Sequence, residues 1–232
     1  MQLLLSASNA LGRWLKADFP RLSASSGKQV GVNTLQSTFQ QFCWQIHIIE
    51  NRYKSIEKTI IATEANSRFT LFLPVEKPLT LGELESRLFM EWQYILAETL
   101  ETQRLLPRVD IAKLLSDIGD VEFKFEWVKN TDLSINGHIT DAGLWVTQTL
   151  DDRQIRYLPP ELALDIAIYL NSLPKRTKSS KQPFVPVEGL LKYCRTLVKR
   201  EYLGVVSEVN SGDGSDTSNV VYLKNIKSNL YY

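Results

Sequence analysis

Residues 69–101, FTLFLPVEKPLTLGELESRLFMEWQYILAETLE, decide the fold expected for this chain. The first five residues alternate along an apolar face and predict a β-strand. Thr80 and Glu83 then have the spacing of a helix-capping box, in which the hydroxyl and the carboxylate each bind a free backbone amide. Apolar residues recur at helical spacing beyond that point and predict a long helix with one buried face: Leu81, Leu84, Leu88, Trp92 and Ile95.

Two more strands are expected before this stretch. Residues 41–49 alternate cleanly, with Phe42, Trp44 and Ile46 on one side of the strand. Residues 59–63 are the expected partner strand, and residues 64–67 form a turn into residues 69–73. The unit predicted here is three antiparallel strands packed on the long helix, followed by a short helix over residues 109–118.

A second β unit is expected after the helices. Residues 121–127 alternate apolar and charged residues, and residues 133–139 contain Asn136-Gly137, a strong hairpin signal. Residues 144–150 predict another strand, and the sequence leaves open whether Asn136-Gly137 or residues 141–143 reverse the chain. A helix over residues 160–173 follows. The expected fold class is α+β, with antiparallel sheets packed against a long central helix and further helices toward both ends.

The chain divides into one core domain and a basic C-terminal part. The core is expected over residues 1–173, with a docking helix over residues 1–19 and a flexible link over residues 23–34. Four residues carry the apolar side of the first helix, which suits either docking on the core or insertion into a membrane interface: Leu4, Leu11, Trp14 and Leu15. The remaining expected segments are a basic linker, a cationic helix and a flexible tail: residues 174–186, 187–204 and 205–232.

Charge is segregated along the sequence. The formal net charge of the whole chain is +1, yet residues 174–232 carry a net +5 and the remainder a net −4. This segregation predicts an anionic partner for the C-terminal part, and the alternative is a solvated linker followed by an ordinary surface helix. Eight residues are the predicted contacts: Lys175, Arg176, Lys178, Lys181, Lys192, Arg195, Lys199 and Arg200.

No pattern in the sequence predicts catalysis, a metal site or a cofactor. The two histidines, His47 and His138, lack further ligands at zinc-binding spacing, although Cys43 and His47 would face the same way on a strand. Cys43 and Cys194 lie in apolar patterns, which disfavours a nucleophilic role for either.

The cysteines and the apolar runs also bear on localisation. Two cysteines are too few for a disulfide framework and fit a reducing compartment such as the cytoplasm. Leu3–Leu5 is too short for a signal peptide, and no run approaches the ~18 apolar residues of a spanning helix. We therefore expect a protein that is soluble or, at most, peripheral to a membrane.

Residues 69–96 resemble the core of rhabdovirus-type viral matrix proteins. In those proteins a strand, a proline and a Trp-bearing helix follow in the same order as Phe69–Leu73, Pro78 and Glu91–Tyr94 here. Ser134–Ile139 is similar to a strand with a central glycine in the same family. The chain departs from the family in lacking a lysine-rich N-terminal arm and a Pro-Pro-x-Tyr motif. The resemblance implies a virion-associated, non-enzymatic assembly protein that bridges a nucleoprotein and an anionic bilayer.

The sequence therefore leaves three possible functions open. The first is a non-enzymatic structural, assembly or adaptor protein that contacts an anionic membrane surface or a nucleoprotein, together with a protein partner or further copies of itself. The second is an accessory nucleic-acid-binding protein or regulator, with the helix over residues 187–202 on phosphates. The third is a metal-dependent nuclease that uses Asp141, Asp151 and Asp152.

Overall fold

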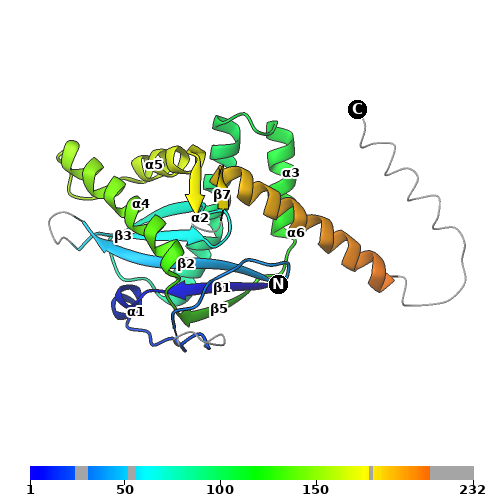
Figure 1. The fold of residues 1–232 in the computed structure, drawn as a ribbon, viewed down its shortest axis with the longest axis horizontal. Coiled ribbons are helices and arrows are strands. Elements are labelled where there is room, and N and C mark those ends of the chain that lie inside the picture. The colour runs from blue at the N-terminus through cyan, green and yellow to red at the C-terminus, as the bar shows by residue number, and fades with distance from the viewer. Residues whose placement is uncertain (24–30, 52–55, 178–179, 210–232) are drawn as a thin grey trace, which may run out of the picture. The chain divides into compact units, whose positions relative to one another are not determined.

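A computed structural model describes residues 1–23, 31–51, 56–177 and 180–209. The α+β class is confirmed (Figure 1). Residues 1–198 form one compact unit, and the chain from Lys199 onward belongs to a second unit. None of the helices in the described ranges is both long enough and apolar enough to cross a bilayer.

The main sheet has five strands in the order β4-β3-β2-β1-β5, and two further strands form a small separate sheet. The strands are β1 (Gln2–Ala7), β2 (Gln41–Glu50), β3 (Lys58–Glu64), β4 (Thr70–Val75), β5 (Lys124–Lys129), β6 (Lys175–Thr177) and β7 (Ser180–Phe184). The helices are α1 (Asn9–Leu15), α2 (Leu81–Thr102), α3 (Arg108–Gly119), α4 (Leu133–Asp152), α5 (Pro160–Ser172) and α6 (Pro186–Val209).

The N-terminal residues form a strand inside the sheet, so the docking helix predicted over residues 1–19 is wrong. β1 lies between β2 and β5 and is parallel to both, which makes the sheet mixed. Leu3, Leu4 and Leu5 are all buried, because both faces of this strand are covered. A continuous apolar run is typical of a buried parallel strand. Only Asn9–Leu15 is helical, and Ser8 caps it by accepting a hydrogen bond from the Leu11 amide at 3.2 Å.

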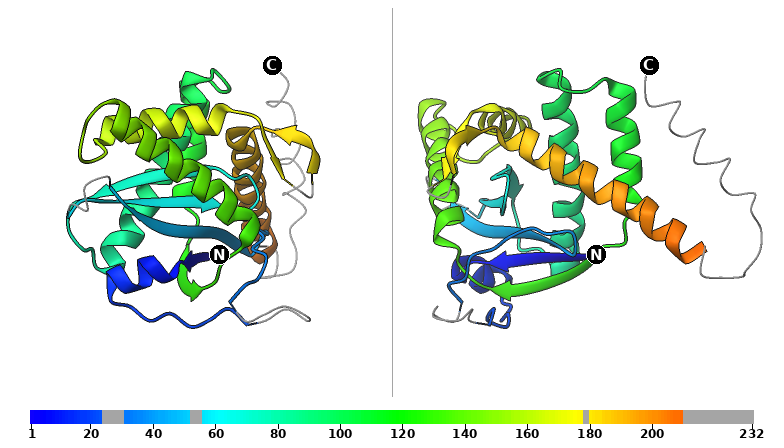
Figure 2. Two further views of the ribbon diagram at one scale, coloured as in Figure 1. Left: turned by 60° about the vertical axis from the view of Figure 1, so that its left-hand side comes forward. Right: turned by 45° about the vertical axis from the view of Figure 1, so that its right-hand side comes forward.

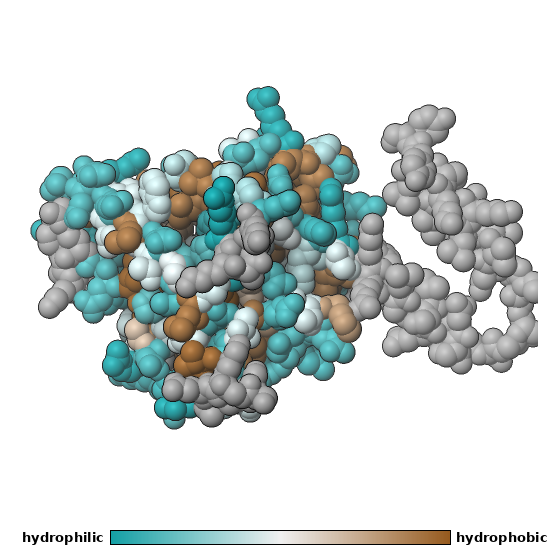
Figure 3. All heavy atoms as spheres, in the orientation of Figure 1, coloured by the Kyte–Doolittle hydropathy of each residue, from teal (hydrophilic) through white to brown (hydrophobic). Residues whose placement is uncertain are grey.

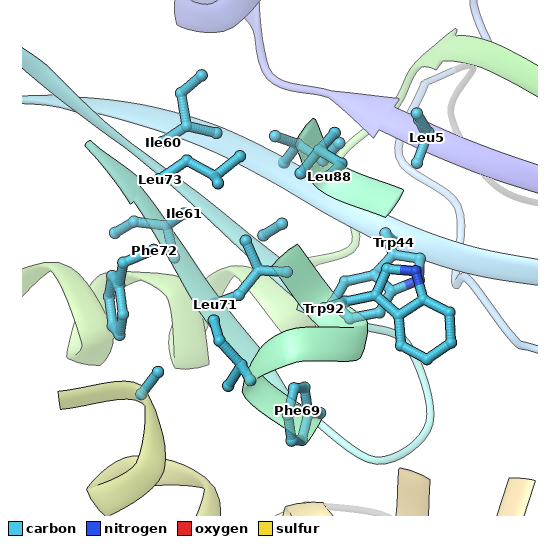
Figure 4. Packing of buried hydrophobic residues seen from close by; sticks show 14 of the residues in the cluster. Leu5, Trp44, Ile60, Ile61, Phe69, Leu71, Phe72, Leu73, Leu88 and Trp92 are labelled. Carbon is cyan, nitrogen blue, oxygen red and sulfur yellow. The ribbon is translucent and has the colours of Figure 1, made fainter. Parts of the chain in front are cut away.

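The stretch from β2 to α2 follows the sequence prediction. β2, β3 and β4 pair antiparallel, and α2 begins with the predicted capping box. The Thr80 amide donates to Glu83 Oε2 at 2.7 Å, and the Glu83 amide donates to Thr80 Oγ1 at 3.2 Å. Trp92 of α2 is buried beside Trp44 of β2, with 6.4 Å between ring centroids (Figure 4). The tryptophan therefore anchors the helix to the sheet.

The strands predicted over residues 133–139 and 144–150 are wrong, because both segments lie in α4. The Asp132 carboxylate accepts from the Ser134 amide at 2.8 Å and so caps the helix at its start. Buried residues recur along α4 at helical spacing: Ile135, Ile139, Ala142, Val146 and Leu150. Helices α4 and α2 lie on opposite sides of the sheet (Figure 2). The strand predicted over residues 121–127 is present, displaced to Lys124–Lys129 as β5.

The segment predicted as a basic linker, residues 174–186, contains the hairpin of β6 and β7. The helix predicted over residues 187–204 is present as α6, which extends to Val209. The part of α6 up to Val198 belongs to the first unit, and there Tyr193 stacks on Phe42 with 4.8 Å between ring centroids. The rest of the predicted tail, residues 210–232, and residues 24–30 of the predicted link lie outside the described residues.

Asparagine side chains replace missing strand partners at two places. Asn171 of α5 brackets the edge strand β4, since its Oδ1 accepts from the Thr70 amide and its Nδ2 donates to the Thr70 carbonyl, both at 2.8 Å. Asn130 binds residue Asn33 in the same manner, at 2.7 and 2.9 Å. All these groups are buried, so each hydrogen bond prevents an unsatisfied polar group.

We expect Asn171→Ala to destabilise the fold by about 2–3 kcal/mol, because it leaves the buried amide and carbonyl of Thr70 without partners. Chemical denaturation followed by circular dichroism measures the loss. Asn136→Ala is the matched control, since Asn136 is half-buried within α4 and alanine favours a helix. Equal denaturation midpoints for the two variants would contradict the role assigned to Asn171.

Candidate anion-binding site

The cations predicted from the C-terminal part of the sequence differ in their exposure. Arg176 on β6 and Lys192 and Arg195 on α6 are exposed. Four others fall outside the described side chains: Lys178, Lys181, Lys199 and Arg200.

Lys175 is held differently from its neighbour Arg176. It is partly buried, and its Nζ donates to the backbone carbonyl of Arg68 at 3.4 Å. Burial lowers the pKa of Lys175 to about 8; Asp141 opposes this shift and Arg68 adds to it. Lys175 therefore belongs to a cluster with the β3–β4 turn and α4, and it is not an outward-facing contact.

A second group of cations lies where β1 and β5 end. These strands are parallel neighbours, with Ala7 opposite Lys129, so their carboxyl ends meet at one edge of the sheet. The chain after β1 folds back on the α2 side of the sheet, where Phe19 stacks on Trp127 and Trp127 donates to Glu85 of α2. The chain after β5 enters α4 on the opposite side. Ligands of open α/β sheets bind at such points, because the diverging connections leave a crevice between them.

Two adjoining hollows of about 280 and 400 Å³ occupy this crevice, and we call them together the carboxyl-edge hollow. Both are lined by Asn9, Arg13 and Lys129. The rest of the lining comes from the neighbourhood of α1 and from the chain beside β5: Ser8, Gly12, Lys16, Ala17, Asp18, Phe19, Arg21, Gly31, Val32, Asn130 and Thr131.

The backbone around the carboxyl-edge hollow is fixed by hydrogen bonds. The Lys129 amide donates to the Pro20 carbonyl at 2.8 Å, and the Leu22 amide donates to the Lys129 carbonyl at 3.2 Å, so the chain at Arg21 runs beside β5. Gly31 has a φ of 80°, a conformation that favours glycine, and its carbonyl accepts from the Thr131 amide at 2.9 Å. The positions of Arg21 and Lys129 therefore follow from the sheet.

The carboxyl-edge hollow is strongly cationic. Its basic residues are Arg13, Lys16, Arg21 and Lys129, and its one acidic residue is Asp18. Arg13, Lys16 and Arg21 are exposed, and Lys129 is half-buried. None of the four forms an ion pair with another described residue. Unpaired cations around a concave surface attract anions, and arginine in particular binds phosphate oxygens in a bidentate manner.

This site was not predicted from the sequence, in which Arg13, Lys16, Arg21 and Lys129 had no assigned role. The available signal was local: the apolar run Leu3–Leu5 is followed three residues later by Ser8, a good helix cap, which is typical of a buried strand that ends where a helix starts.

The residues considered for metal-dependent chemistry do not converge. Asp141 and Asp151 lie on the same helix, ten residues apart, which corresponds to roughly 15 Å. A two-metal site needs ligands around ions ~3.5–4 Å apart. Cys43 and His47 are four residues apart on β2, roughly 13 Å along the strand. Within the described ranges no three His, Cys, Asp or Glu side chains are grouped to hold a metal ion.

The chain matches no protein-family model and no curated protein. The resemblance of residues 69–96 to rhabdovirus-type matrix proteins therefore stays a prediction. Its second part, the strand at Ser134–Ile139, is wrong, because those residues are helical in α4.

Both thiols are expected to be unreactive in the folded protein. Cys43 and Cys194 are buried, and burial, reinforced by the nearby Glu64 carboxylate, raises the pKa of Cys43 to about 12 and also raises the pKa of Cys194. Since the thiolate is the reactive form, a disulfide reagent should modify native protein only as fast as it unfolds, and both cysteines at once in denaturant. Rapid labelling of either cysteine under native conditions would restore a nucleophilic role.

Proposed function

We propose that this protein is a non-enzymatic structural or adaptor protein that binds the phosphate groups of a nucleic acid or nucleoprotein at the carboxyl-edge hollow. The observation that carries the proposal is the placement of Arg13, Lys16, Arg21 and Lys129 around one crevice, unpaired within the described part of the chain. Cations that contact phosphates release condensed counterions, which drives binding independently of base sequence.

A nucleic acid is favoured over a membrane surface by the corrected N-terminal fold. The insertion of an amphipathic helix over residues 1–19 into a membrane interface no longer applies, because Leu3–Leu5 lies inside the sheet and Leu11 is buried. The cations of the carboxyl-edge hollow surround a concave surface, which suits a protruding phosphate backbone better than a flat bilayer. On the face seen in Figure 3, apolar residues form separate patches among polar ones.

Recognition is expected to depend on phosphates and not on bases. The aromatic residue in the lining of the carboxyl-edge hollow is Phe19, which stacks on Trp127 and is only 9% exposed, so it offers little surface for a base to stack on. Proteins that bind single strands without sequence preference use exposed aromatic platforms as well as cations. A duplex, with its regular phosphate backbone, is therefore the preferred probe.

Three triple variants with the same change in net charge test this proposal. The first is Arg13→Gln, Lys16→Gln and Arg21→Gln in the carboxyl-edge hollow. The second removes the exposed cations of the C-terminal part: Arg176→Gln, Lys192→Gln and Arg195→Gln. The third is a control made of exposed cations elsewhere: Lys77→Gln, Lys113→Gln and Arg153→Gln.

Binding to a fluorescent DNA duplex is measured by anisotropy over a range of salt concentrations. The first variant should lose affinity, and the slope of log affinity against log salt should fall by roughly 0.9 for each lost contact. The control variant should bind like the parent protein. Loss of binding in the second variant alone, or tighter binding of the parent to anionic vesicles than to the duplex, would contradict the proposal.

A further inference from the structure

Arg68, in the turn between β3 and β4, combines three locally unfavourable features. Its φ is 60°, a left-handed conformation that costs energy for any residue other than glycine. Its side chain is buried, with 7% of the residue exposed. Its Nε and Nη1 atoms are buried without a hydrogen-bond partner among the described residues, whereas Nη2 donates to Ser134 Oγ at 2.9 Å. Strained and unsatisfied residues of this kind concentrate at functional sites.

The carboxylates nearest Arg68 do not satisfy it. Glu64 accepts from the hydroxyls of Ser37 and Ser67 and from the amides of Asn66 and Ser67. Asp132 accepts from the backbone amides of Leu35, Ser134 and Ile135. Burial lowers the pKa of Arg68, and these two carboxylates only oppose that shift through space. The guanidinium is therefore charged but lacks an acceptor for two of its nitrogens.

Two further basic groups face the same place. Lys175 of β6 donates to the Arg68 carbonyl, and His138 lies one helical turn after Ser134 on α4. Burial lowers the pKa of His138 to about 4, and Lys175 and Arg68 lower it further, while Asp141 opposes the shift. The cations therefore outweigh Asp141 at the imidazole. Ser134 and Asp141 are exposed, so the cluster reaches the surface.

We propose that Arg68, Ser134, His138 and Lys175 form a binding site for one small oxyanion of the phosphate or sulfate type. The oxyanion accepts hydrogen bonds from the guanidinium and ammonium groups, and the neutral imidazole and the serine hydroxyl serve as further donors. None of these four residues lines the carboxyl-edge hollow, so this site is separate from the proposed nucleic-acid contact. A buried water that satisfies Arg68 is the competing explanation.

The two histidines of the chain make the test direct. His138 reports on the cluster, and His47 is the internal control, because burial alone lowers the pKa of His47. Histidine ring signals are followed by NMR from pH 3 to 7 with sodium sulfate, whose charge is constant over this range, and with sodium chloride at equal ionic strength. Bound sulfate offsets the two cations, so it should raise the pKa of His138 and leave that of His47 unchanged.

Variants then separate the oxyanion site from a structural role. Lys175→Met should abolish the sulfate-specific shift of His138, whereas Arg176→Met, which changes the next and exposed residue, should retain it. Arg68→Met should also abolish the shift if this variant folds. If it does not fold, the Lys175→Met variant alone decides the test. The proposal is overturned if the pKa of His138 is equal in sulfate and chloride, or if the sulfate-dependent shift persists in Lys175→Met. A buried water would then be the explanation for the unpaired nitrogens of Arg68.

Discussion

The burial of β1 between two parallel neighbours is the constraint on which the rest of the structure depends. Every amide and carbonyl of a central strand needs a partner, and β1 finds them in β2 on one side and β5 on the other. The residues between β1 and β2, and those between β4 and β5, must therefore cross from one end of the sheet to the other. These crossings place α1 and α2 against the sheet and bring the carboxyl ends of β1 and β5 together, which creates the carboxyl-edge hollow.

Polar side chains complete the sheet where the backbone cannot. Asn171 closes the outer edge of β4, and Asn130 holds the chain at Asn33 beside the end of β5. Asp132 caps α4 and also binds the Leu35 amide, so one carboxylate sets both the start of a helix and the path of a distant segment. Among the described residues, two nitrogens of Arg68 and Nε1 of Trp92 are the exceptions to this pattern, and of these Arg68 carries a charge.

The distribution of charge along the chain differs from its distribution in space. The excess of lysine and arginine in residues 174–232 suggested one cationic segment, but Lys175 turns into a cluster with Arg68 and His138. Arg13, Lys16 and Arg21 are close in sequence, but Lys129 is distant from them and joins them only because β1 and β5 end at the same edge. A phosphate-bearing partner is consistent with both arrangements, and the second concentrates its cations in a concave surface.

Local patterns in the sequence determined the elements whose signals had one interpretation: the strand β2 by its alternation, the start of α2 by Thr80 and Glu83, and the start of α5 by Pro159-Pro160. Local patterns gave wrong predictions where the same residues are compatible with two kinds of secondary structure. Leu3–Leu5 fits a helix or a buried strand, and Asn136-Gly137 fits a turn until the helical spacing of Ile135, Ile139 and Ala142 meets the sheet. Only the tertiary structure decided between them, because the free energy of burying an apolar face depends on the surface that covers it, and a short stretch of sequence does not contain that surface. The same holds for the carboxyl-edge hollow, whose cations come from distant parts of the chain.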